Sequence, residues 1–318
     1  MPHLTREMKT YCVGRYLIEL PASFQRAHLA AGGAGDATFY FGHGADFRTV
    51  DVTVLAHPVS PESFKSAVAQ RAAELAAGIN YETNGTMLLG NQTLEPGQVE
   101  LIYRASAEIA DAQVHELHLL VDDAYVAINT TAFDAAQVQA AQRRLRDMVG
   151  RIRGAADPAS AGRGVCLGPV SVDAGSDYEE MQLGFRAVDH AHADIRFQIS
   201  INTFLQADDE PSLIARGESN LAGLGVSWKK LRKGGRPLAG MDGEQWLGRF
   251  EEAGKHQHGF YAETNTRTPS ARHPKLMLEL LTGGENDYGE PMGSSLDDEQ
   301  AAALWDLLLD SLRVRTGA

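Results

Sequence analysis

The sequence predicts an α+β fold of two structurally repeated domains, each an antiparallel sheet packed against two helices. Alternating apolar residues indicate strands, amphipathic segments indicate helices, and the segments follow the same order on both sides of a linker. The length of 318 residues fits two domains, because domains cluster near about 100 to 150 residues. We expect an N-terminal domain over residues 1–157 and a C-terminal domain over residues 158–318, an internal repeat of the first.

The first half opens at Cys12-Val13-Gly14 and alternates strand-like segments with two helices. Ser60 at the N-cap and Pro61 at the first helical position predict where the first helix begins. The buried face of this helix is expected to carry Phe64, Val68, Ala72 and Leu75. The second helix is expected to bury Val138, Leu145, Met148, Val149 and Ile152. Strands are expected over residues 16–20, 38–41, 49–55, 98–105, 114–121 and 125–129.

The second half repeats this order from Cys166-Leu167-Gly168. A helix is expected over residues 211–224, and a last amphipathic helix carries an apolar stripe that includes Trp305. The expected strands cover residues 169–172, 181–188, 194–202, 245–251, 259–264 and 275–282. Residues 154–164 between the halves are small and nearly devoid of large apolar groups, as is typical of a domain linker.

Charge and hydropathy exclude several classes of protein. The formal net charge is −13, and both halves are acidic, so neither offers the basic face that a nucleic-acid backbone requires. The one basic cluster, residues 229–236, is interpreted as a solvated turn. The sequence contains no run of about 18 apolar residues, so it predicts no membrane span. Residues 1–9 lack an apolar stretch of signal-peptide length, which indicates a cytoplasmic protein or one whose leader has been removed.

The sequence carries no catalytic motif that we recognise. It lacks the G-x-S-x-G turn of common α/β hydrolases. His190 with His192, and His256 with His258, each place two imidazoles on one strand face, but no Cys or third His stands at zinc-ligand spacing. We therefore assign no catalytic residues, no cofactor-binding residues and no metal ligands.

Several separated motifs together resemble one known family. These are residues 12–21 (CVGRYLIELP), residues 276–283 (LMLELLTG), residues 295–299 (SLDDE) and residues 303–306 (ALWD). In this order they are similar to the immunity proteins paired with the fourth class of type VI secretion lipase effectors. The resemblance covers residues from about 9 to 315. None of its motifs is a catalytic motif.

The resemblance implies a non-enzymatic inhibitor that binds a cognate phospholipase effector and protects the producing cell and its kin. It further implies residence in the periplasm, and we expect a monomer without cofactor. Two alternatives stay open. One is a two-lobed module that binds a ligand in the cleft between the domains, and the other is an enzyme whose residues meet only in space.

Cys12 and Cys166 occupy matching positions at the first strand of each half, so we predict a disulfide between them. Repeated units that pack about a local twofold axis bring equivalent residues together. The alternative is two buried free thiols, because unpaired cysteine is among the most buried residue types.

Two segments of the second half have no counterpart in the first, namely residues 265–274 and residues 283–295. Neither is needed to complete a sheet, and long loops in compact domains tend to be functional or disordered. We therefore predict that these segments bind the partner. The residues expected to do so are Arg267, Arg272, Tyr288 and Met292. The alternative is two mobile surface loops with no partner.

Overall fold

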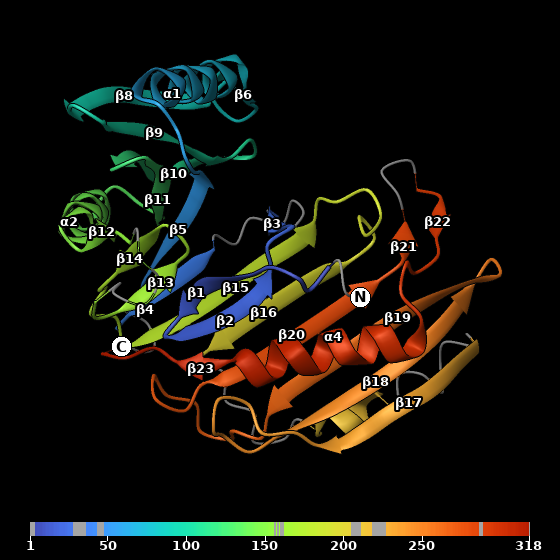
Figure 1. Ribbon diagram of the computed structural model, residues 1–318. Coiled ribbons are helices and arrows are strands. Elements are labelled where there is room, and N and C mark those ends of the chain that lie inside the picture. The colour runs from blue at the N-terminus through green and yellow to red at the C-terminus, as the bar shows by residue number, and fades with distance from the viewer. Residues whose placement is uncertain are drawn as a thin grey trace. The chain divides into compact units, whose positions relative to one another are not determined.

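The computed structural model describes residues 4–27, 36–42, 48–155, 157, 159, 162–204, 211–217, 227–285 and 289–317 (Figure 1). The fold is α+β and rich in strands, as predicted. The chain divides into two compact units: unit 1 comprises Met1–Gly32 with Tyr178–Ala318, and unit 2 comprises Gly33–Asp177. These units differ from the expected halves, because the first 32 residues group with the C-terminal part.

Unit 2 is built on an antiparallel sheet with the strand order β4-β5-β11-β10-β9-β8. Its strands are β4 (Ala37–Phe41), β5 (Arg48–Ala56), β8 (Leu88–Glu95), β9 (Gln98–Ser106), β10 (Ile109–Val121) and β11 (Ala124–Ala132). The predicted tight turn at Asp122-Asp123 is confirmed, because Val121 pairs directly with Ala124. Asp122 accommodates the turn with a positive φ of 53°, a conformation that Asp tolerates better than most residues.

The described residues of unit 2 include two α-helices. Helix α1 (Pro61–Ala77) begins where the sequence predicts, because the Ser60 side chain accepts a hydrogen bond from the Ser63 N–H at 3.1 Å. Its four buried residues are the predicted ones, and it covers β8 and β9 (Figure 1). Helix α2 (Val138–Val149) buries Ala141, Leu145 and Met148. Short strands complete the unit, namely β6 (Ile79–Asn80), β7 (Gly85–Thr86), β12 (Ile152–Gly154), β13 (Val165–Leu167) and β14 (Val170–Val172).

The antiparallel strands of unit 1 follow the order β17-β18-β19-β20-β16-β15. Its strands are β15 (Tyr178–Ala187), β16 (Arg196–Asn202), β17 (Ser227–Gly235), β18 (Gly243–Glu252), β19 (Lys255–Thr264) and β20 (Lys275–Thr282), with β3 (Phe24–Ala27) paired to β15. The chain's first hairpin, β1 (Met8–Gly14) and β2 (Tyr16–Pro21), joins unit 1 through β23 (Arg313–Val314), which pairs with β2. This pairing explains why the first residues group with unit 1.

Helix α4 (Asp298–Ser311) lies along the face of the unit 1 sheet (Figure 1). Asp297 and Gln300 form a capping box at its start, which satisfies two backbone N–H groups that a helix end leaves unpaired. Its buried stripe, including Trp305, is the predicted one. Of the other helix expected in this half, residues 213–217 are helical, while most of the predicted remainder to residue 224 lies outside the described residues. The two-helix layout of this half stays a prediction.

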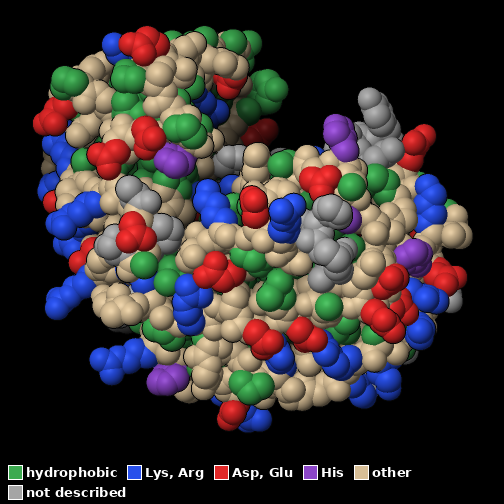
Figure 2. All heavy atoms as spheres, in the orientation of Figure 1, with side chains coloured by type: hydrophobic (Ala, Val, Ile, Leu, Met, Phe, Trp, Pro, Cys, Tyr) green, Lys and Arg blue, Asp and Glu red, His purple; other side chains and the backbone are tan. Residues whose placement is uncertain are grey.

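The interpretation of residues 229–236 as a solvated turn is wrong. Most of this cluster lies in β17, the edge strand of the unit 1 sheet, and pairs with acids of α4. Arg232 contacts Asp306 at 2.6 Å, and Arg236 contacts Asp310 at 2.7 Å. Figure 2 shows acidic and basic side chains intermixed on this face. The error arose because basic residues on an edge strand look like a polar loop when their acidic partners lie about 70 residues further along the chain.

Candidate functional site

The segment 265–274 connects β19 to β20 and is anchored at its base. The hydroxyls of Thr264 and Thr266 both donate to the Pro274 carbonyl, at 3.1 and 3.2 Å. Ser270 and His273 exchange backbone hydrogen bonds, which closes a tight turn. Arg267 and Arg272 are exposed. The segment is thus a shaped loop that presents two arginines.

A cavity of about 340 Å³ opens beside Arg267. Glu263, which is almost buried, holds two of the cations that line this cavity: Arg216 at 2.5 Å and Lys275 at 3.3 Å. Glu244 accepts a hydrogen bond from the Ile214 backbone N–H. Within the part of the chain that the structure describes, Arg267 forms no ion pair, so its guanidinium can pair with an external carboxylate.

The segment 283–295 contains a small hairpin of β21 (Gly284–Glu285) and β22 (Pro291–Met292). Buried Asp194 closes its base, because one carboxylate oxygen accepts from the backbone N–H groups of Gly283 and Ser295, both at 3.0 Å. Met292 is half-buried in β22, and Tyr288 lies outside the described residues. The base of this segment is therefore also held in place.

The structure does not bring the predicted residues into one cluster. The segment 265–274 precedes β20 and the segment 283–295 follows it, so they lie at opposite ends of this strand, and Figure 1 shows the β21–β22 hairpin beyond one of these ends. Eight strand residues span roughly 23 Å at about 3.3 Å each. Arg267 and Arg272 therefore lie apart from Met292, at a separation that one standard protein interface can still cover.

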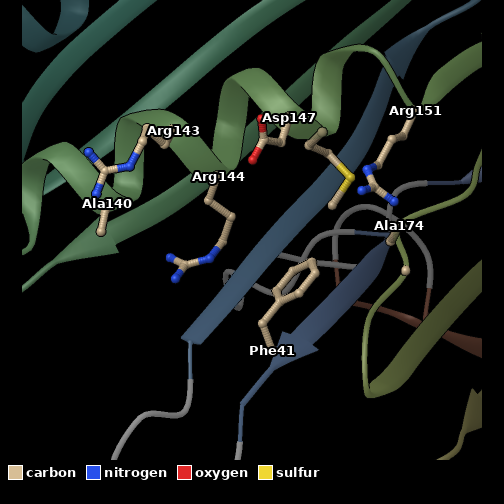
Figure 3. Close-up of a pocket in the computed structure, with 9 residues that line it drawn as sticks. Phe41, Ala140, Arg143, Arg144, Asp147, Arg151 and Ala174 are labelled. Atoms are coloured by element: carbon tan, nitrogen blue, oxygen red, sulfur yellow. The ribbon is translucent and has the colours of Figure 1, made fainter.

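A second concave surface, which sequence reasoning missed, lies along α2 in unit 2 (Figure 3). Its volume is about 430 Å³. The residues on which its character depends are Phe41, Arg143, Arg144, Asp147, Met148 and Arg151. Arg144 projects from α2 and Arg151 from the turn that follows it, on either side of Phe41, and the Arg144 guanidinium lies 5.9 Å from the Phe41 ring centroid. We call this surface the arginine pocket.

The arginine pocket is strongly basic in an acidic protein. Three arginines line it against one carboxylate, Asp147. Burial lowers the pKa of Arg144, and the positive charge of Arg48 lowers this pKa further. Figure 2 shows Lys and Arg side chains gathered over the part of unit 2 that holds α2. The only signal in the sequence was the density of arginines between residues 143 and 153, which the apolar stripe of the helix obscured.

A buried polar cluster beneath α1 bears on the enzyme alternative. The Tyr125 hydroxyl is 2.7 Å from His118 Nδ1, and His118 Nε2 is 2.8 Å from Glu116 Oε1. Arg71 and Tyr103 also donate to Glu116. Tyr125, His118 and Glu116 all line a cavity of about 450 Å³. A tyrosine, a histidine and a carboxylate in series are the kind of arrangement that nucleophilic catalysis uses.

The electrostatics of this cluster favour a structural role. Burial raises the pKa of Glu116, but hydrogen bonds from His118 and Arg71 outweigh burial and bring it to about 2. Burial raises the pKa of Tyr125 to about 12. Catalytic acids and bases have pKa values near the working pH, and neither of these two groups does. The cluster is best described as an internal hydrogen-bond network that ties α1 to the sheet.

This network predicts acid sensitivity. The pKa of Glu116 is lower in the folded state than its usual 4.5, so its stabilising effect is complete above pH 4.5 and is lost as the pH falls through about 2. We expect the free energy of unfolding to drop by about 3 kcal/mol over this window from Glu116 alone. Urea unfolding at successive pH values measures the drop. The Glu116→Gln variant should show a flatter profile, and a profile as steep as that of the wild type would contradict the assignment.

The two histidine pairs do not form metal sites in the described residues. His258 uses both ring nitrogens, with Nδ1 2.7 Å from Thr282 Oγ1 and Nε2 3.1 Å from Asp298 Oδ1. His256 Nε2 is 3.2 Å from the Leu296 carbonyl oxygen, and His192 Nδ1 is 3.0 Å from Ser295 Oγ. No group of three or more metal-ligating side chains is found in the part of the chain that the structure covers.

Two anchored, charged surface segments and no group of metal-ligating side chains in the described residues suit a protein that binds a partner. Family models identify which one: the N-terminal domain of Tle cognate immunity protein 4 matches residues 9–157, and the C-terminal domain matches residues 159–317. The chain therefore belongs to the Tle cognate immunity protein 4 family, and it is an immunity protein of type VI secretion. No curated protein matches the chain significantly. Among the described helices, none combines the length and apolar character that crossing a bilayer requires.

Solved structures share the fold. The apo immunity protein TplEi of the type VI secretion system of Pseudomonas aeruginosa superposes with a TM-score of 0.67 at 19% identity, over 98% of both chains. A chain of the Tle4-Tli4 complex superposes with a TM-score of 0.66 at 19% identity, over 98% of both chains. TplEi complexed with the "L" peptide gives 0.61 at 20% identity, over 97% of this chain and 98% of that one.

Proposed function

We propose that this immunity protein acts by binding its cognate phospholipase effector directly, without catalysis of its own. The observation that carries the proposal is the match of both family models, which together span nearly the whole chain. A structural relative of the same fold is described in complex with Tle4. Direct binding also suits the structure, because anchored loops pay less conformational entropy on association than free ones.

The place of action follows from the effector. A phospholipase delivered by a neighbouring cell attacks from the periplasm, so the inhibitor is needed there, and we place this protein in the periplasm as a monomer. The complex protects the producing cell and its kin. The segments 265–274 and 283–295 are proposed to contact the effector through Arg267, Arg272, Met292 and Tyr288.

The proposal is tested by mixing the protein with the purified effector encoded by the adjacent gene. Phospholipid hydrolysis is followed while the immunity protein is added in increasing amounts, and complex formation is followed by size-exclusion chromatography. We expect activity to vanish near a fixed stoichiometric ratio, with the two proteins eluting together. Full activity at a large excess of folded immunity protein would refute the proposal.

Replacing both exposed arginines, Arg267→Ala with Arg272→Ala, should weaken effector binding about 10-fold or more, because arginine often anchors protein contacts. The Met292→Ala variant tests the second segment in the same way. Calorimetry gives the dissociation constants. Arg186→Ala, an exposed arginine on β15, is the matched control and should bind like the wild type. If the loop variants keep wild-type affinity while remaining folded, the contact surface lies elsewhere.

A further inference from the structure

The arginine pocket is the most distinctive charged feature of unit 2 that the proposed contacts leave unused. The chain carries a net charge of −13, yet Arg143, Arg144 and Arg151 line one cavity with a single acid at its wall. We propose that the arginine pocket receives an acidic side chain, Asp or Glu, that projects from the protein partner. This inference rests on the proposed function, because the partner in question is the effector.

The geometry suits a carboxylate. Figure 3 shows Arg144 and Arg151 on either side of Phe41, so the space above the aromatic ring lies between two guanidinium groups. Arg151 is steadied by its hydrogen bond to the Asp173 carbonyl at 3.3 Å. A guanidinium presents paired N–H donors that match the two oxygens of a carboxylate. Phe41 and Met148 supply apolar walls against which the methylene groups of the incoming Asp or Glu side chain can pack.

The positive charges near the pocket also repel one another, and a bound anion would offset this repulsion. Burial lowers the pKa of Arg144, and the charge of Arg48 lowers it further, so positive groups repel one another at this site. Among the described residues, Asp147 forms no ion pair with the arginines of the pocket. A bound carboxylate would therefore relieve the repulsion and gain two charge-assisted contacts.

The shape of the site favours a protein side chain over a membrane. A cavity of about 430 Å³ admits a projecting residue, whereas a bilayer surface cannot enter a recess. Small residues keep the recess open: a Cβ at Gly175 would lie only 2.8 Å from Arg151 Nη1. The overall negative charge of the chain would in addition repel an anionic bilayer.

The test compares two double variants, each of which removes two positive charges. One pair of arginines lines the pocket and the other lies outside it. The pocket variant is Arg144→Gln with Arg151→Gln, and the control is Arg146→Gln with Arg153→Gln, both exposed and outside the pocket lining. Calorimetry with the purified effector should show binding at least 10-fold weaker for the pocket variant and within about 2-fold of wild type for the control. The pocket variant should also lose part of the salt dependence. Equal affinities for the two variants would overturn the proposal.

A second arm separates this inference from the proposed function. If the wild-type protein fails to bind the effector, the proposed function fails, and the pocket is judged on small probes alone. N-acetyl-glutamate amide, inorganic phosphate and vesicles containing phosphatidylglycerol are titrated while the NMR signals of the arginine Nε–H groups are followed. The proposal expects the glutamate probe to shift Arg144 and Arg151 in the wild type. Shifts caused only by phosphate or only by vesicles would overturn it.

Discussion

Replacing Trp305 by alanine is expected to lower the free energy of unfolding by about 3 to 5 kcal/mol. Trp305 is fully buried in α4, and its ring centroid lies 6.2 Å from that of Phe260 in edge contact. Its Nε1–H donates to Gln245 Oε1 at 3.1 Å, so the variant leaves both a cavity and an unpaired buried amide. Urea unfolding followed by circular dichroism measures the loss.

Leu307→Ala is the matched control for this prediction. Leu307 is on the same helix but is 39% exposed. Its removal therefore creates no cavity and should cost less than about 1 kcal/mol. Trp305→Phe should fall between the two variants, because it keeps an aromatic ring but not the N–H donor. A Trp305→Ala loss as small as that of Leu307→Ala would show that α4 does not anchor the unit 1 core.

Removing the two cysteines should have an effect of similar size. Cys12 in β1 and Cys166 in β13 are both buried, and neither is a free thiol in the structure. A bridge that closes so long a loop contributes about 4 to 5 kcal/mol in the chain-entropy model. The Cys12→Ala with Cys166→Ala variant should lose this amount in urea unfolding without reductant.

Reduction provides the internal control. Dithiothreitol should destabilise the wild type to the level of the double variant and leave the double variant itself unchanged. Mass spectrometry of unreduced peptides reports the linkage directly. Two unmodified thiols in protein purified from the periplasm would rule out the bridge.

Local features of the fold were predictable from the sequence. The Ser60 cap, the apolar faces of α1 and α4 and the turn at Asp122-Asp123 depend on residues within a few positions of one another. Periodicity and capping residues encode such features directly. The pairing of Tyr16 in β2 with Val314 in β23 links opposite ends of the chain. No local pattern encodes it, which is why the grouping of the N-terminal hairpin with unit 1 was not predictable from the sequence.

The candidate site likewise combines features that local sequence predicts with features that only the fold brings together. A comparison of the two halves predicted the exposed segment carrying Arg267, because an insertion is visible in the sequence. The arginine pocket was not predictable in the same way, since Phe41 and Arg144 lie about a hundred positions apart and meet only in the fold. Glu116 and His118 are a middle case: their i, i+2 spacing places them on one face of β10, but their shared hydrogen bond needs the burial that α1 provides.

The measurement that tests the central claim most directly is survival of bacteria that export the effector to their own periplasm. Colony counts are compared for cells carrying this protein with an export signal, the same protein retained in the cytoplasm, and no immunity protein. We expect the exported form to restore growth to the level seen with a catalytically inactive effector, and the cytoplasmic form to give no protection. Cell death despite abundant, folded protein in the periplasm would contradict the account.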